Sequence, residues 1–114
     1  MSDVNVFEFG AGDAVRIVTE DGEEFVGEFV GDDRSPADEY SKGYVDLTLE
    51  GVAWEDVRDR VDQSVLHVKQ RSARRTGRPQ DAIVYGYAER DSIADPYETV
   101  DLGTVETIER RNTE

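Results

Sequence analysis

The chain has 114 residues, a length that fits one domain able to bury a modest core. It contains no cysteine, which excludes a disulfide framework and a thiolate metal site. Twenty-seven acidic and thirteen basic side chains give a formal net charge of −14, and no apolar run reaches membrane-spanning length. The start of the chain also lacks the basic and apolar regions of a signal peptide, so we expect a cytoplasmic protein.

The first half of the chain predicts a hairpin. Residues 1–12 fit a short edge strand or a turn of helix over one end of the fold. Two apolar-alternating segments then flank Asp21-Gly22, which favours a tight turn, so we expect strands at about 13–20 and 23–31. Gly27 lies in mid-strand and is expected to mark a sharp bend or a close approach of backbone, as in a sheet that curls into a barrel.

Residues 31–43 are polar, contain proline and glycine, and are expected to form a loop. Apolar alternation predicts the later strands at about 44–50, 64–70, 82–88 and 97–108, the last with a kink at Gly103. The polar stretch 89–96 is expected to be a loop and the tail 110–114 to fray. Together these elements predict a single all-β domain over residues 1–114, a strongly bent antiparallel barrel of five or six strands.

Residues 53–61 leave two interpretations open. Trp54, Val57 and Val61 are spaced i, i+3, i+7 among charged residues, which predicts a short amphipathic helix. A polar excursion with one irregular turn is the alternative.

The spread of acidic residues indicates a protein of a halophile-type, archaeal-type cytoplasm. In ~1 M salt the Debye length shrinks to about 3 Å, so self-repulsion is screened while hydrated carboxylates keep the surface wet. Only Lys42 and Lys69 are lysine, which agrees with this interpretation because lysine adds a long apolar stem with each charge. The alternatives are an acidic protein of ordinary salt or a binder of a basic partner.

Nothing in the sequence nominates a catalytic centre. The one histidine, His67, lies among apolar neighbours without an evident nucleophile or carboxylate partner, so a structural or solvent-facing role is expected. Carboxylate pairs such as Asp32-Asp33 recur throughout the chain and do not indicate a metal site. Because phosphate-binding glycine loops, zinc spacings and nucleophile elbows are also missing from the sequence, we expect a non-enzyme without a cofactor or metal.

One segment departs from the general acidity, a predicted basic hairpin loop at 69–80. Residues 69–78 hold five basic side chains and no acidic one, namely Lys69, Arg71, Arg74, Arg75 and Arg78. The planar guanidinium can bridge phosphate oxygens and stack on bases, so one interpretation is a nucleic-acid-contacting arm. The alternative is a loop whose charges pair with the acidic surface and relieve its repulsion.

Salt bears on this choice, because contacts to the phosphate backbone weaken steeply as salt rises. A binder that works in high salt would also need bases to stack on aromatic side chains. The chain has five tyrosines that could supply such faces, although tyrosines on barrel strands are more often core residues: Tyr40, Tyr44, Tyr85, Tyr87 and Tyr97.

The stretch 13–50 resembles the first signature motif of the Sm-like family of small RNA-binding β-barrels. The matching positions are Val15, Ile17, Asp21-Gly22, Phe25, Gly27, Gly31-Asp32 and Tyr44-Val45-Asp46-Leu47-Thr48-Leu49. This resemblance implies a five-stranded bent barrel, often assembled into rings by edge-strand pairing, that binds uridine-rich RNA. It also implies that Tyr44 stacks on a base and that Asp46, at the family's asparagine position, contacts the base edge.

The chain departs from the family pattern at three places. About ten residues, 33–43, are inserted before the aromatic position, and Asp46 offers only hydrogen-bond acceptors where asparagine would offer both kinds of group. The second motif is matched only by 102–105, without its arginine, for which Arg74, Arg75 and Arg78 could substitute.

The leading hypothesis is a non-catalytic nucleic-acid-binding barrel, with RNA as the partner. Its predicted site consists of Lys69, Arg71, Arg74, Arg75, Arg78, Tyr44 and Asp46. The alternative is a protein-interaction or scaffold module whose open strand edges recruit a protein partner or a second copy, with the basic loop only balancing surface charge.

Overall fold

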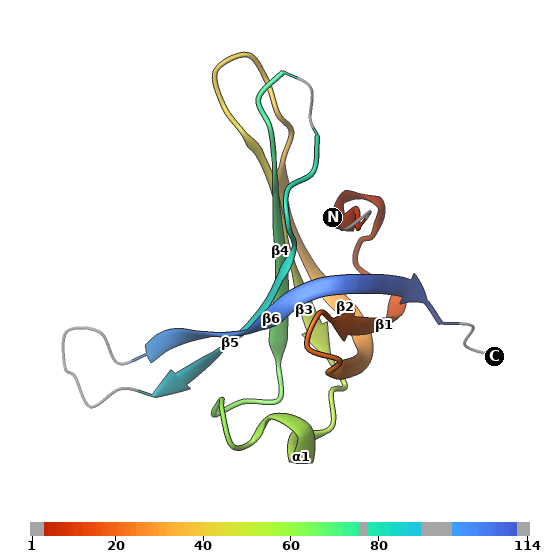
Figure 1. Ribbon diagram of the computed structural model, residues 1–114, viewed down its shortest axis with the longest axis vertical. Coiled ribbons are helices and arrows are strands. Elements are labelled where there is room, and N and C mark those ends of the chain that lie inside the picture. Colours follow the sequence, from red (N-terminus) through yellow and green to blue (C-terminus); the bar gives the residue numbers. More distant parts are fainter. Residues whose placement is uncertain (1–3, 76–77, 90–96, 112–114) are drawn as a thin grey trace.

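The computed structural model describes residues 4–75, 78–89 and 97–111. They form six antiparallel strands in a closed barrel of order β1-β2-β3-β4-β5-β6, in which β6 returns to pair with β1 (Figure 1). The elements are the 3₁₀ helix η1 (Val6–Glu8), β1 (Ala14–Thr19), β2 (Glu24–Ser35), β3 (Gly43–Glu50), α1 (Trp54–Val57), β4 (Leu66–Ser72), β5 (Ile83–Glu89) and β6 (Tyr97–Arg110). The prediction of a small, bent all-β barrel is confirmed.

Alternation along the strands fills the barrel with apolar side chains. In β3 every second residue is buried, so that Val45, Leu47 and Leu49 point inward while their neighbours face outward. The largest fully buried side chains include Phe25, Phe29, Ile17, Leu47, Leu49 and Leu66. Within the described residues, no helix has the length and apolar character needed to cross a membrane.

The strand β2 bends because its two halves serve different neighbours. Its first half pairs with β1 as far as Glu28, and its second half pairs with β3 through Ser35. The register against β3 shifts between Phe29 and Gly31, a bulge that turns the strand. A Cβ placed on Gly27 would lie 2.3 Å from the carbonyl oxygen of Glu50, so the predicted close approach of backbone at Gly27 is confirmed.

The strand β6 closes the barrel in the same way. It pairs with β5 over 97–104 and with β1 over 105–110. Gly103 lies at the crossover with φ of 140°, a conformation that favours glycine, and the registers of both neighbours shift close to it. The predicted kink at Gly103 therefore coincides with the point where β6 changes partner.

The prediction of a loop over 31–43 is confirmed for 36–42 and wrong for the two flanking parts, which belong to strands. β2 continues to Ser35 and β3 begins at Gly43, so the connection comprises only 36–42. The two strands remain in register from Gly31 opposite Thr48 to Ser35 opposite Tyr44. Charged residues are tolerated in this part of β2 because the ribbon projects from the barrel into solvent. The inserted residues 33–43 thus lengthen the hairpin.

The predicted basic loop at 69–80 also starts too early. Lys69 and Arg71 belong to β4, which ends at Ser72, and an isolated bridge joins Ser72 to Pro79. Side chains of β4 continue to alternate between buried and exposed positions up to Ser72. Gln70 can occupy a buried position because its polar side chain is hydrogen-bonded inside the fold.

Both interpretations of 53–61 are right in part. The helix α1 covers only four residues, and the remainder forms an irregular turn closed by hydrogen bonds from the amides of Arg60 and Val61 to the carbonyl of Val57. Val57 and Val61 are buried as the helical spacing predicts. Trp54 departs from the predicted apolar face, since 44% of its surface is exposed.

At the amino end, the helical interpretation of residues 1–12 is confirmed by η1, which lies against β4. At the carboxyl end, Arg110 is ordered: its guanidinium lies 4.4 Å from the ring centroid of Phe9, and the amide of Arg111 donates to the carbonyl of Ala14 at 2.7 Å. The rest of the tail predicted to fray, 112–114, and the predicted loop residues 90–96 lie outside the described residues.

The approach at Gly27 gives a stability prediction. Gly27→Ala should destabilise the fold by about 1–3 kcal/mol, because the new methyl group meets a backbone oxygen that can move only with β3. The free energy of unfolding in denaturant measures the effect. Gly22→Asn is the control, because a Cβ there meets no atom within 4 Å and asparagine tolerates the positive φ of that turn. Equal stability of Gly27→Ala and the wild type would contradict the argument.

Candidate functional site

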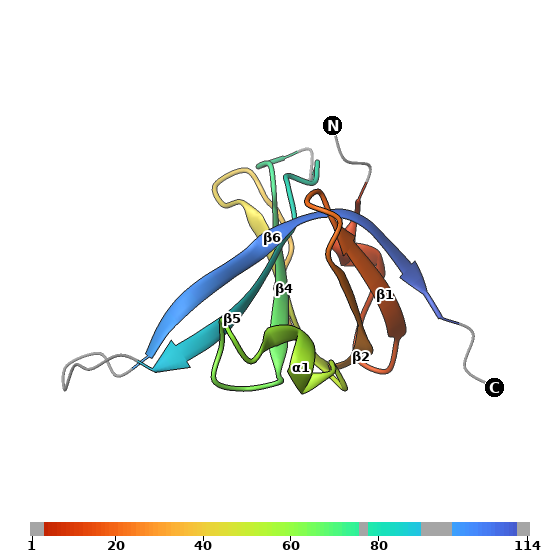
Figure 2. The same ribbon diagram turned by 60° about the horizontal axis from the view of Figure 1, so that its bottom comes forward.

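The ends of two hairpins project together beyond the barrel. We call their described residues, 31–46, 69–75 and 78–80, the finger. Figures 1 and 2 both show the yellow 36–42 turn beside the teal 72–75 and 78–80 segments. The amide of Arg75 donates to the carbonyl of Asp38 at 2.9 Å, which joins the two turns. Arg75 adopts a φ of 63° to make this contact. The basic segment is therefore tied to a second hairpin along its described part.

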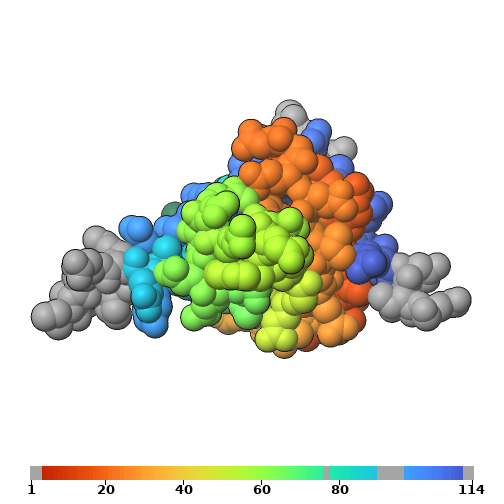
Figure 3. Space-filling view, turned by 90° about the horizontal axis from the view of Figure 1, so that it is seen from below, coloured from red at the N-terminus to blue at the C-terminus, as the bar shows by residue number. Residues whose placement is uncertain are grey.

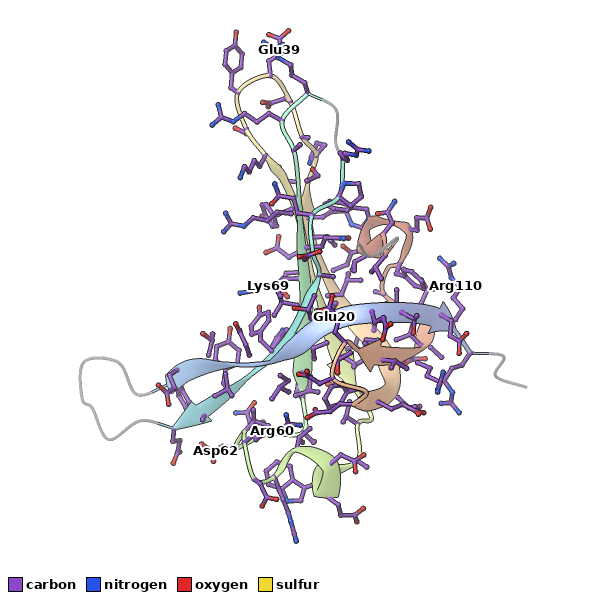
Figure 4. All side chains as sticks on the ribbon, viewed as in Figure 1. Glu20, Glu39, Arg60, Asp62, Lys69 and Arg110 are labelled. Carbon is purple, nitrogen blue, oxygen red and sulfur yellow. The ribbon has the colours of Figure 1, made fainter. Side chains whose placement is uncertain are left out.

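The finger differs in charge from the rest of the molecule. It carries seven basic and five acidic side chains, whereas the remaining residues carry six basic and twenty-two acidic ones. Figure 4 places Glu39 at the tip of the finger and Lys69 near its base. Basic side chains are thus concentrated on one projection of a strongly acidic body.

The register of β3 and β4 places four of the predicted site residues on one outward face. Tyr44 lies opposite Arg71 and Asp46 lies opposite Lys69. Tyr44 is 41% exposed, and its hydroxyl donates to Asp33 at 3.2 Å, which raises the pKa of Tyr44. This face therefore presents an aromatic ring beside two cationic side chains.

The remaining predicted site residues lie beyond this face, where the chain turns. The amide of Ala73 donates to the carbonyl of Arg78 at 2.9 Å, so the turn that carries Arg74 and Arg75 is closed by backbone. Tyr40, at the neighbouring turn, is 84% exposed. The structure brings all seven predicted residues onto the finger, as a strand face with Lys69 and Arg71 and a tip with Arg74 and Arg75.

The described basic side chains differ in whether they form ion pairs. Four arginines pair with carboxylates, one of them, Arg34, in the finger: Arg16 with Glu24 and Glu109, Arg34 with Asp32, Arg60 with Glu23, and Arg110 with Asp13. Within the described part of the chain, no such ion pair is formed by Lys69, Arg71, Arg74 or Arg75. Lys69 lies opposite Asp46 and acts on its charge, whereas Arg71, Arg74 and Arg75 have no carboxylate partner in the described residues.

A polar and aromatic cluster at the base of the finger was not foreseen from the sequence. The hydroxyl of Tyr85, on β5, crosses β4 and donates to Asp46 on β3. The Tyr85 ring stacks on His67, with centroids 5.0 Å apart, and the ammonium of Lys69 lies 4.7 Å from the Tyr85 centroid. Tyr87 meets both rings edge-on. The expectation that His67 lacks a carboxylate partner is wrong, because its Nδ1 lies 3.7 Å from a carboxylate oxygen of Asp46, which belongs to another strand.

The cluster fixes the protonation of its members. Burial acts to raise the pKa of Asp46, but neighbouring His67, the hydroxyl of Tyr85 and the charge of Lys69 together outweigh it and lower the pKa. Burial and the hydrogen bond to Asp46 raise the pKa of Tyr85, so its hydroxyl remains a donor at neutral pH. Asp46 is therefore an ionised acceptor that holds Tyr85 beneath Lys69.

A shallow hollow of about 370 Å³ adjoins this cluster on the outer face of the barrel. Its lining combines aromatic rings with hydrogen-bonding groups: Gly31, Asp32, Asp33, Asp46, Thr48, His67, Tyr85 and Tyr87. No group of three or more His, Cys, Asp or Glu side chains in the described residues is arranged to hold a metal ion. The arrangement offers rings and polar atoms to a planar, polar ligand group.

Gln70 anchors the finger to the barrel. This side chain is 1% exposed, and its amide nitrogen donates to the carbonyls of Val4 at 2.9 Å and Gln80 at 2.6 Å. Its carbonyl oxygen accepts from the amide of Val6 at 2.6 Å. Sequence reasoning missed this residue. The available signal was a glutamine at an inward position of an alternating strand, which needs buried partners.

Comparison of the chain with models of known protein families, with curated proteins and with solved structures finds no significant match. The functional argument therefore depends on the geometry of this chain.

The lowered pKa of Asp46 predicts a pH-dependent contribution to stability. A carboxylate whose folded pKa lies below its unfolded value stabilises the fold above about pH 4, and the stabilisation is lost as pH falls through the folded pKa. Asp46→Asn should therefore lower the unfolding midpoint at pH 7, and the difference from wild type should shrink on acidification to about pH 3. Thermal unfolding at both pH values measures this.

Tyr85→Phe serves as the companion variant. It keeps the ring against His67 and Lys69 but removes the hydroxyl that donates to Asp46. Its deficit should show the same pH dependence with a smaller amplitude. A deficit of Asp46→Asn that is equal at neutral and acidic pH would show that the charge of Asp46 does not contribute.

Proposed function

We propose that this protein is a non-catalytic RNA-binding barrel that contacts the nucleic acid through the finger. The observation that carries the proposal is the set of basic side chains without an ion pair in the described part of the chain, Lys69, Arg71, Arg74 and Arg75. In a chain with twenty-seven carboxylates, cations that avoid their own surface are available to an external anion. Arginine suits phosphate because its planar fork matches two phosphate oxygens at once.

The aromatic side chains of the finger support contacts to bases. Tyr44 is half exposed directly opposite Arg71, so one ligand can place a base on the ring and its phosphate on the guanidinium. Tyr40 offers a second ring beside the tip. Stacking tolerates any base and persists when salt weakens the phosphate contacts. Single-stranded RNA with accessible bases fits this surface.

Asp46 takes a positioning role in this proposal. Its carboxylate would repel a phosphate, and it is already engaged by the hydroxyl of Tyr85. By holding that ring beneath the ammonium of Lys69, it keeps Lys69 on the outer face between Arg71 and His67. Asp46 thus acts indirectly, by positioning the Tyr85 ring that supports Lys69 on the cationic face.

The acidic body suits a protein of a halophile-type cytoplasm. Outside the finger, twenty-two carboxylates against six basic groups would repel nucleic acid at low salt. In molar salt this repulsion extends only about 3 Å from each charge, which leaves the finger accessible to its ligand. The carboxylates outside the finger then disfavour contacts between RNA and the rest of the protein.

Kinship with the Sm-like family is part of the proposal. It is supported by the amino-terminal helical turn, the bent β2 and the position of Tyr44 on a hairpin that projects from the barrel. The chain differs in having six strands that close within one molecule. Ring assembly by edge pairing would have to use strand segments that extend past the closed part of the barrel.

One such segment supports the second candidate, a protein-interaction module. Over Tyr97–Leu102, β6 pairs with β5 on one side, and none of the described strands pairs with its other side. An extended segment of a protein partner could add to this edge. Affinity capture followed by nuclease treatment separates the two candidates, because a protein bound at the edge stays after the RNA is removed.

Removal of the tip charges should weaken RNA binding. We expect Arg74→Gln/Arg75→Gln to reduce affinity for a uridine-rich single strand, and to reduce the slope of log K against log salt concentration by about 1.4 for two lost phosphate contacts. Fluorescence anisotropy of labelled RNA over a salt series measures both quantities.

The matched control is Arg58→Gln/Arg111→Gln. It removes the same two charges from exposed arginines outside the finger that also lack an ion pair in the described part of the chain. If the two double variants bind alike, the contribution is one of net charge and the finger is not an RNA site.

The stacking role of Tyr44 is tested separately. Tyr44→Ala should weaken RNA binding by roughly 1–3 kcal/mol, the range for loss of one base–aromatic stack, and the loss should persist in molar salt. Tyr44→Phe should bind as the wild type does, because it loses only the hydroxyl that donates to Asp33. Affinity that falls equally in both variants would assign the effect to the hydroxyl and would contradict stacking.

A further inference from the structure

The end of the barrel opposite the finger carries a groove beside α1. One hollow of about 520 Å³ is lined by Glu24, Val26, Gly51, Ala53 and Asp56. A second, of about 240 Å³, shares Glu24 and Asp56 with the first, so the two adjoin. Figure 3 views this end and shows the green 51–62 segment beside the orange start of β2. The lining of this groove therefore combines the apolar side chains of Val26 and Ala53 with the carboxylates of Glu24 and Asp56.

Trp54 lies at this end, next in the chain to Ala53, which lines the groove. It is the only tryptophan of the chain, and 44% of its surface is exposed. Tryptophan is enriched among the residues that dominate binding energy at protein interfaces, and it is the best aromatic partner for a guanidinium. Its exposure marks this end as a contact surface for a cationic group.

The charges at this end are the complement of those on the finger. Residues 20–26 and 50–62, which we call the acidic end, carry nine acidic and two basic side chains. Within the described residues, Glu55, Asp56 and Asp59 form no ion pair. Carboxylates without an ion pair thus outnumber the one such arginine, Arg58, at this end, whereas the finger tip carries Arg74 and Arg75 beside Glu39.

We propose that the finger of one copy docks into the groove of a second copy, head to tail. Arg74 and Arg75 at the finger tip would meet the carboxylates of the acidic end, with a guanidinium over Trp54. The finger and the α1 segment of the acidic end lie at opposite ends of the longest axis of the molecule, which measures 43 Å (Figure 1). The contact is therefore heterologous, since it joins two different surfaces. Every pair keeps one unoccupied finger and one unoccupied groove, so further copies can add to form an open chain or a closed ring.

The net charge of −14 does not prevent this contact. At 0.15 M salt the Debye length is about 8 Å, so repulsion between the distant acidic parts of two copies is largely screened. Contacts across the interface lie well within that distance and remain attractive. In molar salt the apolar floor of the groove and the ring of Trp54 would supply the remaining attraction.

This inference goes beyond RNA binding and depends on a surface that RNA binding does not use. Because both partners would occupy the same finger, RNA and a second copy exclude one another. The groove separates the two activities: a groove variant should lose self-association and bind RNA as the wild type does.

The experiment uses two charge-reversed variants of the full chain, purified after nuclease treatment. Arg74→Glu/Arg75→Glu alters the finger, and Glu55→Arg/Asp56→Arg alters the groove. Sedimentation of each variant, of their mixture and of the wild type is measured over a concentration series at ordinary salt. Asp101→Arg/Glu106→Arg is the control, because it changes the charge by the same amount at exposed positions of β6.

We expect the wild type and the β6 control to associate with rising concentration. Each of the other two variants should associate at least about tenfold more weakly, the size of effect typical of close charge pairs at interfaces. The mixture of the two variants should associate again, because the intact finger of one fits the intact groove of the other and the reversed charges of the altered finger and groove are also complementary. Thermal unfolding and circular dichroism establish that each variant is folded.

Three outcomes would overturn the proposal. A wild type that stays monomeric at all concentrations has no such contact, and variants that associate like the wild type would place the contact elsewhere. A monomeric wild type whose tryptophan emission shifts on addition of an arginine-rich peptide would assign the groove to another basic partner. Should Glu55→Arg/Asp56→Arg fail to fold, Asp56→Lys/Asp59→Lys replaces it, since it leaves the first position of the acidic pair in α1 unchanged.

Discussion

Closure of six strands into one ring is the constraint from which the rest of the structure follows. Two of the strands, β2 and β6, pair with different neighbours along their two halves, and each has a glycine near the point where the partner changes. At Gly27 a Cβ would lie 2.3 Å from the carbonyl oxygen of Glu50, and at Gly103 a Cβ would lie 3.1 Å from the side chain of Thr19. A side chain at Gly27 would meet the backbone of β3, and a side chain at Gly103 would need both a positive φ and a shift of Thr19.

The bend in β2 also allows the finger to extend away from the barrel. Beyond the bulge at Phe29 and Gly31, β2 has left β1 and continues with β3 alone, so this part of the hairpin extends into solvent. β4 follows it through Ser72, and Gln70 secures the base of the finger by three hydrogen bonds to buried backbone groups. A surface that bears arginines is thereby held on ordered strands, which reduces the conformational entropy that a ligand would have to remove.

The sequence predicted what alternation and turn chemistry encode, and it failed where non-local pairing decides. Asp21-Gly22, Gly27 and Gly103 are local signals, and they placed the hairpin and the two bends correctly. The length of the finger was missed because charged residues in 31–35 look like a loop until their partner strand is known. The cluster around Asp46 was missed for the same reason, since Tyr85 reaches Asp46 only in the register that β4 sets between them. The sequence of any single strand therefore does not show that these residues form a cluster.

The distribution of charge, more than its total, is what this fold organises. A uniformly acidic chain would need no arrangement of its few cations beyond local pairing, and Arg16, Arg60 and Arg110 of the barrel are paired in that way. The finger cations stand apart because β3 and β4 direct Lys69 and Arg71 outward, and because the turn at Arg75 is bound to Asp38 through backbone atoms alone. Carboxylates of the neighbouring hairpin are meanwhile taken by its own groups: Asp38 accepts from the amides of Tyr40 and Ser41, and Asp33 accepts from Tyr44. Asp33 and Asp38 keep their negative charge in these hydrogen bonds, but no described carboxylate forms an ion pair with Arg71, Arg74 or Arg75, so these three guanidinium groups stay without an ionic partner on a protein with a net charge of −14.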